Sequence, residues 1–453
     1  MKEEKEGKIP EKIGEHSEHQ KDLPKVVAAA GIGTWIDYYE FLLSSFISGT
    51  IWPVIFFGPL VKSPSLALSL SLLSFATAYL IRPVGAYIFG HLGDRWGRQS
   101  TLVLTLIISL LGVLGIGLTP PYVSIGLAAP VLLTLFRMIQ GIGLGGEWGG
   151  ASSWVIEFSP GNKRGFWGSL MNGSVNVGIG TAGLVYAIIL SLFHGQSLLS
   201  IGWRIPYFSA AALLVVGAII RYRLYESPPF QKLRAEMKMA KRPSLEVMRG
   251  KGGFYILLGA LSWVYLTAVS PLLAGGVQIA YFSSLHLRFF GLPAPIFVLL
   301  TIGIWYIVAY PFVTILGWLS DRIGRKKSFI IGQILLLLSI PIFVLAVNSL
   351  NPVLIFLTYG FLLVSQMSPF GILPAWFSEL FPTKYRYSGA GLAFQWGGFG
   401  TGVAATILPI IIANARGISL ITLPAAEEVV LVIIGIAAAV LLPETRGSPL
   451  REE

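Results

Sequence analysis

Two acidic side chains inside a long apolar run are the first residues with evident chemistry. Asp37 and Glu40 lie three positions apart, so they share one face of a helix. Two carboxyl groups held close together resist double ionisation, and one of them then keeps a proton. A carrier that couples protons to its cargo needs such a group. The alternative is that both side chains lie near the membrane surface and extend their charges into water.

A second apolar run carries a cation, an amide and a carboxylate. At 3.6 residues per turn, Gln140 and Glu147 fall on one face, with Arg137 on its flank. A charge at a helix centre in a bilayer is costly, so these residues are candidates for function. Arg137 requires an anion, either the carboxylate of a solute or an internal partner such as Glu147. Both interpretations stay open, because a carrier can exchange one partner for the other.

Arg82 lies inside a third apolar run, directly before Pro83. It has two interpretations, contact with an anion or a gate, and extension of its long side chain to the membrane surface. Several polar residues in other runs line a solute path or form hydrogen bonds between helices. These residues are Asn172, Asn176, Gln278, Gln366 and Gln395.

A motif of glycines and charges occurs twice, each time between two long apolar runs. Its first copy contains Gly90, Asp94, Arg95, Gly97 and Arg98, and its second copy contains Gly317, Asp321, Arg322, Gly324 and Arg325. We interpret each copy as a tight, charged turn that joins two helices, because glycine permits a sharp reversal of the backbone. A repeat at this spacing indicates a chain built from two similar halves.

A second pair of repeats places an acid and a base at matching positions. Glu157 and Arg164 in the first half correspond to Glu379 and Arg386 in the second. With the charges of the repeated motif, they predict salt bridges that close an inner gate. One exposed pair contributes only about 0–1 kcal/mol, but several together bias two conformations of similar energy. The alternative is that these charges only fix the topology.

The composition determines the class of protein. Of the 453 residues, 54% are hydrophobic and 12% are charged, and the mean hydropathy is +0.72. This composition excludes an ordinary soluble domain, and the apolar runs reach the roughly 20 residues that cross a bilayer as a helix. We predict an all-α membrane protein with twelve transmembrane helices in two pseudo-symmetric six-helix bundles. The predicted spans are 26–55, 66–90, 100–118, 128–156, 166–193, 204–222, 254–284, 295–318, 328–347, 353–378, 388–413 and 423–443.

These spans divide the chain into five segments. The segments are a cytoplasmic tail 1–25, a first bundle 26–222, a cytoplasmic linker 223–252, a second bundle 253–443 and a cytoplasmic tail 444–453. The first 25 residues lack the apolar core of a signal peptide.

The net charge of +11 is distributed unevenly. Most of the 33 basic residues lie in the tails, in the linker and in every second connection. This asymmetry places both termini and the repeated motif on the cytoplasmic side of the cell membrane. The basic excess therefore reflects topology and does not indicate a nucleic-acid partner. The chain has no cysteine, which excludes disulfides and thiolate metal sites.

Several longer patterns together resemble one family of carriers. They begin at Arg82 (RPVGA), Arg137 (RxxQG), Gly145 (GGEWG), Gly202 (GWRIP) and Glu379 (ELFPTxxRYSG). The chain resembles the major facilitator superfamily and, within it, the metabolite:proton symporters. The family usually has Glu-x-Tyr-Asp-Phe in the first helix, whereas this chain has both carboxylates in exchanged positions, at Asp37 and Glu40. The resemblance implies the major facilitator fold, a central cavity and uptake coupled to protons.

We therefore expect a proton-coupled importer of a small polar solute, anionic or zwitterionic, and most simply an organic acid. It would work by alternating access in the lipid bilayer, as a monomer, with protons as coupling ion and no other cofactor. The alternatives are a sugar-type or drug-type carrier of the same superfamily, or a receptor that binds without transport. An enzyme is not expected, because the five histidines lie in tails or loops without metal-ligand spacing.

Overall fold

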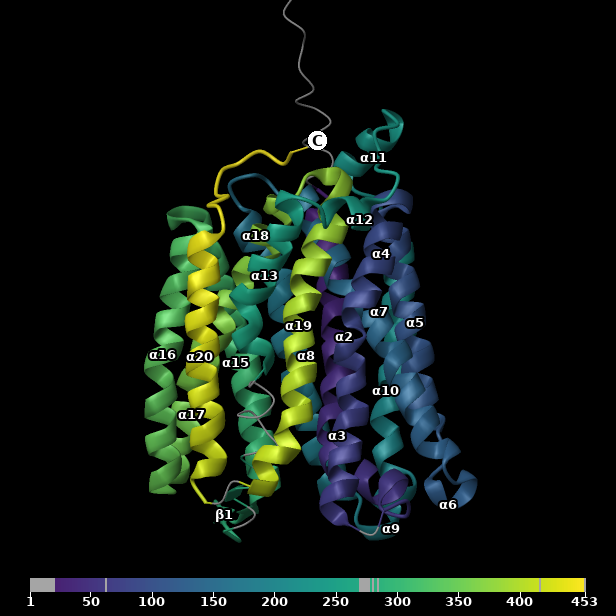
Figure 1. Ribbon diagram of the computed structural model, residues 1–453, viewed down its shortest axis with the longest axis vertical. Helices are drawn as coiled ribbons and strands as arrows, with labels where there is room; N and C mark the ends of the chain where they lie inside the picture. Colours follow the sequence, from purple (N-terminus) through teal and green to yellow (C-terminus); the bar gives the residue numbers. More distant parts are fainter. Residues whose placement is uncertain are drawn as a thin grey trace, which may run out of the picture.

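The computed structural model describes residues 21–61, 63–268, 278, 281–282, 285–414 and 417–451, and most of their side chains; those of 266–268, 401 and 404–414 are not included. Most of the predicted first tail, residues 1–20, therefore lies outside the described part. The helices run along the long axis of the molecule in two groups (Figure 1). Helix α2 of the first group begins, and α20 of the second group ends, at the same end.

The first half contains six segments that run the length of the molecule. Arg82–Trp96 directly continues Pro64–Leu80 as one span, so these two helices count together. In chain order the helices are α2 (Leu23–Thr50), η1 (Pro53–Phe57), α3 (Pro64–Leu80), α4 (Arg82–Trp96), α5 (Arg98–Leu118), α6 (Tyr122–Ile125), α7 (Ala128–Phe158), α8 (Arg164–Leu192), α9 (Gly195–Ser200), η2 (Gly202–Arg204) and α10 (Ile205–Tyr222).

The second half repeats this plan after two short helices of the linker, α11 (Pro228–Ala235) and α12 (Pro243–Val247). A two-stranded antiparallel ribbon, β1 (Arg288–Phe289) with β2 (Leu292–Pro293), lies at the far end. The remaining helices are α13 (Lys251–Ala268), α15 (Ala294–Ile323), α16 (Arg325–Ser349), α17 (Pro352–Met367), η4 (Ser368–Ile372), α18 (Leu373–Leu380), η5 (Thr383–Tyr385), α19 (Arg386–Asn414) and α20 (Ser419–Leu441).

Composition and capping explain these helices. Within the described ranges, nine segments are long and apolar enough to cross a bilayer. Helices α2, α13 and α19 are not among these nine, but they run alongside them, along the same axis. The Ser63 side chain accepts a hydrogen bond from the backbone N–H of Leu66, and Pro64 occupies the first turn of α3. Asn351 caps α17 in the same way, again before a proline. Both arrangements favour helix initiation, because proline needs no N–H partner there.

The repeated motif differs from the predicted turn. Gly97 and Gly324 alone form the reversals, with φ of 119° and 106°, which an L side chain rarely adopts. Gly90 and Gly317 instead lie inside α4 and α15, because both helices continue past the predicted ends of their spans. A Cβ atom at Gly90 would lie 2.8 Å from the Cα atom of Ser388. These two glycines therefore permit close helix packing and make no turn.

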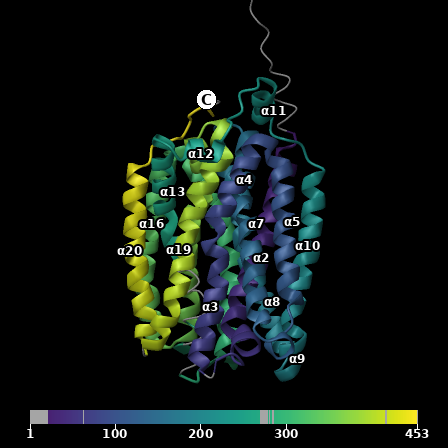
Figure 2. The ribbon, with the colours of Figure 1, turned by 45° about the vertical axis from the view of Figure 1, so that its right-hand side comes forward.

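The two halves meet along specific helices. In the interface, α8 packs along α15, and α19 packs against α3, α4 and α7. Helix α16 lies at the outer edge of the second half in Figure 1, and α20 and α10 lie at opposite edges of the molecule in Figure 2. Interface helices therefore carry the residues that respond when one half moves relative to the other.

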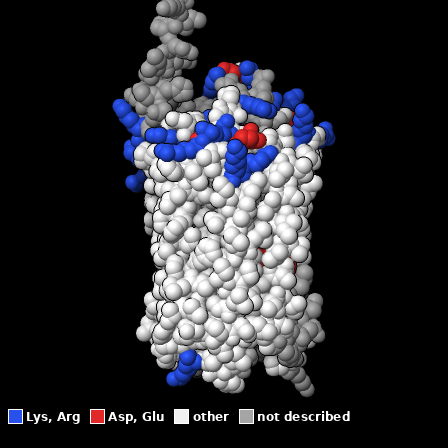
Figure 3. All heavy atoms as spheres, turned by 90° about the vertical axis from the view of Figure 1, so that its left-hand side faces the viewer, with Lys and Arg blue, Asp and Glu red and all other residues white. Residues whose placement is uncertain are grey.

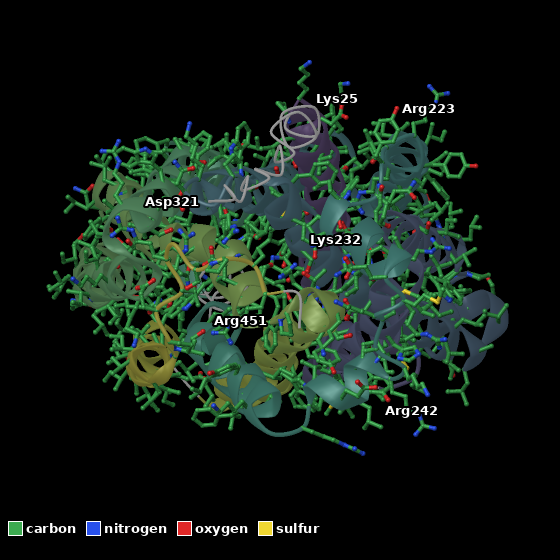
Figure 4. All side chains as sticks on the ribbon, turned by 90° about the horizontal axis from the view of Figure 1, so that it is seen from above. Lys25, Arg223, Lys232, Arg242, Asp321 and Arg451 are labelled. Carbon is green, nitrogen blue, oxygen red and sulfur yellow. The ribbon has the colours of Figure 1, made fainter. Side chains whose placement is uncertain are left out.

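Charge separates the two ends of the molecule. Lysine and arginine side chains gather at the end that carries α11, α12 and the last described residues, whereas the middle of the face shown in Figure 3 is almost uncharged. We call this end the basic end. Figure 4 looks onto it, with Lys25 and Arg223 over the first half and Asp321 over the second. The distribution has the asymmetry that the sequence predicts.

Candidate functional site

Six predicted pathway residues lie inside the first half. Helices α2, α4 and α7 supply them, and each is at most 4% exposed. The residues are Asp37, Glu40, Arg82, Arg137, Gln140 and Glu147. They do not form one network, because two separate groups of hydrogen bonds hold most of them.

The first group is built around Glu147. Both oxygens of its carboxylate accept hydrogen bonds from Arg221, which α10 supplies. The Thr105 hydroxyl also donates to Glu147, at 3.0 Å. Arg221 donates further to backbone carbonyls of α2, where Gly33 makes room, since a Cβ atom there would collide with the guanidinium. Glu147 is therefore paired with Arg221 in this conformation, and an internal partner of Arg137 would have to be another acid.

The second group links Glu40, Gln140 and Arg137. Arg137 donates to the amide oxygen of Gln140, and the amide nitrogen of Gln140 donates to Glu40. Arg137 also donates to the backbone carbonyl of Phe75 at 3.2 Å, and its guanidinium lies 4.7 Å from the ring centre of Phe41. One amide therefore joins this arginine and this carboxylate, and aromatic rings surround the cation.

Arg82 and Asp37 are the two charged residues without such partners. The guanidinium of Arg82 lies 4.2 Å from the ring centre of Phe41 and 4.4 Å from that of Tyr79. Within the described residues no carboxylate lies within ion-pair distance of Arg82, and its Nε has no hydrogen-bond partner. Neither oxygen of Asp37 has a partner there either. Arg82 is 4% exposed, so its extension to the membrane surface is excluded in this conformation.

Arg82 and Asp37 line the same small cavity, which lies where the two halves meet. Helix α2 contributes Thr34, Asp37 and Tyr38, and α19 of the second half contributes Gln395. The full lining is Thr34, Asp37, Tyr38, Arg82, Leu144, Glu147, Trp148 and Gln395. The cavity has room for about one water molecule. A solute of several atoms can enter only when the helices move apart.

A column of aromatic rings begins at Trp148, which lines this cavity. Trp148 stacks on Phe394 at 3.8 Å between ring centres, and Phe394 stacks on Trp263 at 4.0 Å. The Trp148 indole also donates to Asn172 at 2.8 Å, and Asn172 donates to the backbone carbonyl of Phe370 at 2.6 Å. The stack joins α7 of the first half to α19 and α13 of the second. Any relative motion of the halves must separate or shift these rings.

At the basic end, Glu157 joins the two halves. Arg98 of the first half lies 3.1 Å from its carboxylate, and Arg386 of the second half lies 2.7 Å from it. All three are buried. The predicted gate charges are therefore not exposed pairs of low value. Removing one partner of a buried ion pair typically costs about 3–5 kcal/mol, because it leaves an uncompensated charge.

The second copy mirrors the first. Glu379 lies 2.9 Å from Arg325 of its own half and 3.6 Å from Arg164 of the other half. Arg164 also donates to the backbone carbonyl of Ser448 in the last described segment. Each repeated glutamate thus binds one arginine from each half, so the ion pairs cross the interface.

The two motif aspartates also reach across the interface. Asp94 accepts hydrogen bonds from the backbone N–H groups of Tyr387 and Ser388 at the start of α19. Asp321 accepts from those of Gly165 and Phe166 at the start of α8, both at 2.8 Å. A carboxylate is favourable there, because the first N–H groups of a helix lack partners and the helix dipole is positive.

The neighbouring arginines of the motif take no part. Arg95 and Arg322 are exposed and form no ion pair with the described residues. The Arg322 guanidinium lies 3.8 Å from the ring centre of Trp318. Asp94 and Asp321 pair instead with Arg98 and Arg325, four residues later, so the predicted role of Arg95 and Arg322 in the gate has no support here.

Four residues of this end were not predicted. The Ser227 hydroxyl donates to Glu157, and the Thr445 hydroxyl donates to Glu379 at 2.6 Å. The preceding residues, Glu226 and Glu444, accept hydrogen bonds from the first N–H groups of α5 and α16. Burial raises the pKa of Glu226. The signal that could have found them is the repeated Glu-Ser and Glu-Thr after the sixth and twelfth spans.

The linker also touches both halves. The Ser244 hydroxyl of α12 donates to the backbone carbonyl of Tyr87 at 2.7 Å and lies 3.0 Å from the hydroxyl of Ser388. Glu246 accepts a hydrogen bond from the hydroxyl of Tyr385 at 2.9 Å. Burial, with this carboxylate beside it, raises the pKa of Tyr385 to about 12. Helix α12 is therefore part of the closed basic end.

Fold and site together define an α-helical membrane transporter with two bundles and a central cavity. A family model described as Major Facilitator Superfamily matches residues 41–405. The glycine betaine/proline/ectoine/pipecolic acid transporter OusA of Dickeya dadantii is 32% identical over 439 residues, which are 95% of this chain and 85% of that one. The inner membrane metabolite transport protein YhjE of Escherichia coli is 34% identical over 400 residues, 86% of this chain and 87% of that one.

Solved structures agree on the fold. The proton:xylose symporter XylE bound to 6-bromo-6-deoxy-D-glucose superposes with a TM-score of 0.75 at 20% identity, over 95% of this chain and 98% of that one. The chain therefore belongs to the Major Facilitator Superfamily and is similar to its metabolite transporters. This confirms the predicted family, the predicted twelve-span fold and the prediction of a transporter over an enzyme.

Proposed function

We propose that the protein imports a small organic solute with a carboxylate group, most simply an organic acid, together with protons. The basic end would face the cytoplasm of the cell, with both termini there, because basic connections are retained on that side. One chain would suffice, since a single pair of bundles contributes all the residues that line the cavity. The coupling ion would be a proton, and no bound cofactor enters the mechanism.

The observation that carries this proposal is that Arg82 and Asp37 line one buried cavity: among the described residues Arg82 forms no ion pair, and neither oxygen of Asp37 accepts a hydrogen bond. A buried carboxylate that accepts no hydrogen bond is a favourable place for a proton, because its ionised form has lost most of its hydration. A buried guanidinium without an anion is in turn a binding site for one, since its planar donors match a carboxylate. Proton and solute therefore have complementary places a short way apart.

The charge balance explains why the two would bind together. Asp37, Glu40 and Glu147 oppose Arg82, Arg137 and Arg221, so the cluster is neutral when all six are ionised. One proton on Asp37 leaves an excess positive charge, which an anionic solute at Arg82 cancels. The fully loaded cluster is neutral again and can be enclosed at low electrostatic cost. Each ligand thereby favours binding of the other.

The basic end supplies the gate of this mechanism. The crossing pairs Glu157–Arg386 and Arg164–Glu379 hold it closed in the conformation described here. Opening toward the cytoplasm would break both pairs and draw Asp94 and Asp321 away from the helix starts that they cap. Each half retains its own partner, Arg98 for Glu157 and Arg325 for Glu379, so no glutamate is left without a cation. This arrangement suits two conformations of similar energy.

Uptake into proteoliposomes with an imposed inward proton gradient tests the proposal. We expect accumulation of a radiolabelled carboxylate solute, found by a thermal-shift screen, that collapses when a protonophore removes the gradient. Asp37→Asn should abolish accumulation against a gradient but retain exchange of solute. Binding without accumulation by the wild-type protein would instead indicate a receptor. Accumulation of an uncharged sugar, with no carboxylate solute taken up, would indicate a sugar-type carrier.

A zwitterionic solute is the second candidate. Transporters with proline and betaine in their names are similar to this chain over 95% of its length. The cavity contains an arginine for a carboxylate, and it also contains the Trp148 ring, a surface that attracts cationic groups. Competition decides between the two candidates: an organic acid should displace the bound solute far better than a zwitterion if the charge balance governs binding.

A further inference from the structure

One buried carboxyl group lies outside the cluster and the gate described above. Glu428 is on α20, the last helix, and it is 0% exposed. It lies nine residues from the start of α20 at Ser419, about 13 Å along the axis at 1.5 Å per residue. This places it near the middle of the span, in the half that holds none of the three arginines of the cluster. Helix α20 lies on the outer side of that half (Figures 1 and 2).

The surroundings of Glu428 are polar but contain no cation. Its Oε1 accepts a hydrogen bond from the side-chain amide of Gln366 on α17, at 2.8 Å, whereas its Oε2 has no partner among the described residues. Three more buried polar side chains of neighbouring helices belong to this region. They are Tyr265 on α13, Gln333 on α16 and Tyr359 on α17.

The titratable groups near Glu428 offer no compensating charge. Tyr265 faces it from α13 and Tyr359 from α17, and both are neutral phenols at ordinary pH. Its own helix adds only the half-buried acid Glu427. No lysine, arginine or histidine of the described residues forms an ion pair with Glu428. An ionised carboxylate here would therefore be an isolated buried charge, which proteins avoid by binding a proton.

We propose that the Glu428 carboxyl is a second proton-binding site, located in the second bundle and separate from Asp37 and Glu40. With a proton on Oε2, the group is a neutral acid that accepts from Gln366 and offers one O–H to a neighbouring oxygen. Tyr359 and Gln333 carry buried oxygens without partners, so the region has acceptors for that hydrogen. The acid would hold α20 to α17 across the space between α13 and α16.

The sign of the pH dependence follows from this assignment. Loss of the proton leaves an unpaired negative charge inside the second bundle, so deprotonation requires water to reach Glu428. The packing described here is therefore stabilised at low pH, and this contribution is lost as the pH rises through the titration of Glu428. The proton bound there need not move with the solute, so this site stands whether or not Asp37 couples transport to protons.

Infrared difference spectroscopy on reconstituted protein tests the assignment. We expect a protonated-carboxyl C=O band, distinct from any band that Asp37→Asn removes, that shifts in heavy water, is lost in Glu428→Gln, and changes frequency in Glu428→Asp. Glu427→Gln is the matched control: it removes the adjacent, half-buried acid and should leave the band intact. A Glu428→Gln spectrum with the band unchanged would overturn the proposal.

Thermal unfolding in detergent gives a second measurement, which also covers the case that Glu428→Gln folds poorly. The melting temperature of the wild-type protein should fall as the pH rises. The melting temperature of Glu428→Asp should also fall, but with its midpoint at a different pH. Glu428→Gln, where it folds, should show a smaller loss, whereas Glu427→Gln should behave as the wild type. Equal pH dependence in the wild type and Glu428→Gln would contradict a proton on Glu428. Solute uptake by Asp37→Asn is a separate measurement. The pH dependence of unfolding therefore tests Glu428 even if proton-coupled import is not found.

Discussion

Arg82 and Arg137 are both buried arginines beside the ring of Phe41, yet their partners differ. Arg137 is occupied by Gln140 and by a backbone carbonyl, whereas Arg82 contacts aromatic rings, the Tyr38 hydroxyl and the cavity, and its Nε has no partner among the described residues. The free donors belong to Arg82, so we place the solute carboxylate there. Our sequence-based hypothesis placed it near Arg137 and Gln140. Substitutions that keep the charge can separate the two sites.

We predict that Arg82→Lys lowers uptake of a carboxylate solute by roughly tenfold to a hundredfold, equal to about 1.5–3 kcal/mol for hydrogen bonds to a charged group. Lysine keeps the charge but loses the planar donors and the stacking on Phe41 and Tyr79. Initial uptake rates in proteoliposomes measure the effect. Arg137→Lys is the control and should change uptake much less. Reversed sensitivities of the two variants would return the solute to Arg137.

A second prediction concerns the pair of Arg221 and Glu147. Arg221→Met leaves Glu147 buried without a cation and should destabilise the protein by about 3–5 kcal/mol. The double variant Arg221→Met/Glu147→Gln removes both charges and should recover a large part of that loss. Unfolding of the purified protein in detergent, followed by heat or denaturant, provides the comparison. No recovery in the double variant would mean that Arg221 acts through its bonds to α2 instead.

At the scale of elements, glycines determine how closely the halves approach. Helices α7 and α19 meet where Gly149 faces Gly391, and a Cβ atom at Gly149 would lie 2.6 Å from the Cα atom of Gly391. Lipid offers no hydrophobic drive for helix association. Van der Waals contact between closely approaching backbones, which small residues permit, stabilises the association instead. The same contact lies between the aromatic stack and the gate. We therefore expect the width of this contact to limit closure of the basic end.

We predict that Gly149→Val shifts the protein away from the closed basic end. The chain has no cysteine, so Ser388→Cys, a buried position in that interface, reports without background. A thiol reagent should label Ser388→Cys faster in the protein that also carries Gly149→Val than in the protein that carries Ser388→Cys alone. Gly49→Val is the matched control, because no atom lies within 4 Å of a Cβ there. Equal labelling in all three proteins would show that this contact does not limit closure.

At the scale of the whole molecule, the charge asymmetry and the internal repeat meet at the basic end. Two similar halves are joined through crossed ion pairs at the basic end, and the linker helix α12 contacts both. The far end has few basic residues (Figure 3). This polarity predicts an orientation in the membrane, and the prediction can be tested directly.

We predict that the basic end faces the cytoplasm. Lys25→Cys lies at the basic end. Val123→Cys lies in α6, at the opposite end of the molecule, and Val123 is 82% exposed. A membrane-impermeant maleimide added to intact cells should label Val123→Cys and not Lys25→Cys, and inverted vesicles should show the reverse. The wild-type protein serves as the blank. Labelling of Lys25→Cys in intact cells would invert the proposed topology.

Much of the fold was predictable because its signals are local or repeated in the chain. Apolar runs of membrane-spanning length, glycines at reversals and two copies of one motif each appear without knowledge of any contact. Helix ends were less predictable: α4 continues to Trp96 because Gly97 alone makes the turn. The charged candidates of α2, α4 and α7 were also found from the sequence, since a charge in an apolar run is conspicuous.

The partner of each charge was decided only by the tertiary structure. Arg221 lies at the end of its run and looks like one more basic residue of the linker, yet it turns inward to Glu147. Glu428 sits in a helix without a repeat or motif around it, and its isolation is visible only once α13, α16 and α17 surround it. The crossed pairs of Glu157 and Glu379 likewise depend on which half lies opposite. Sequence determines which side chains must be buried, but the energy of a buried charge depends on its neighbours in space, and these come from helices far apart in the chain.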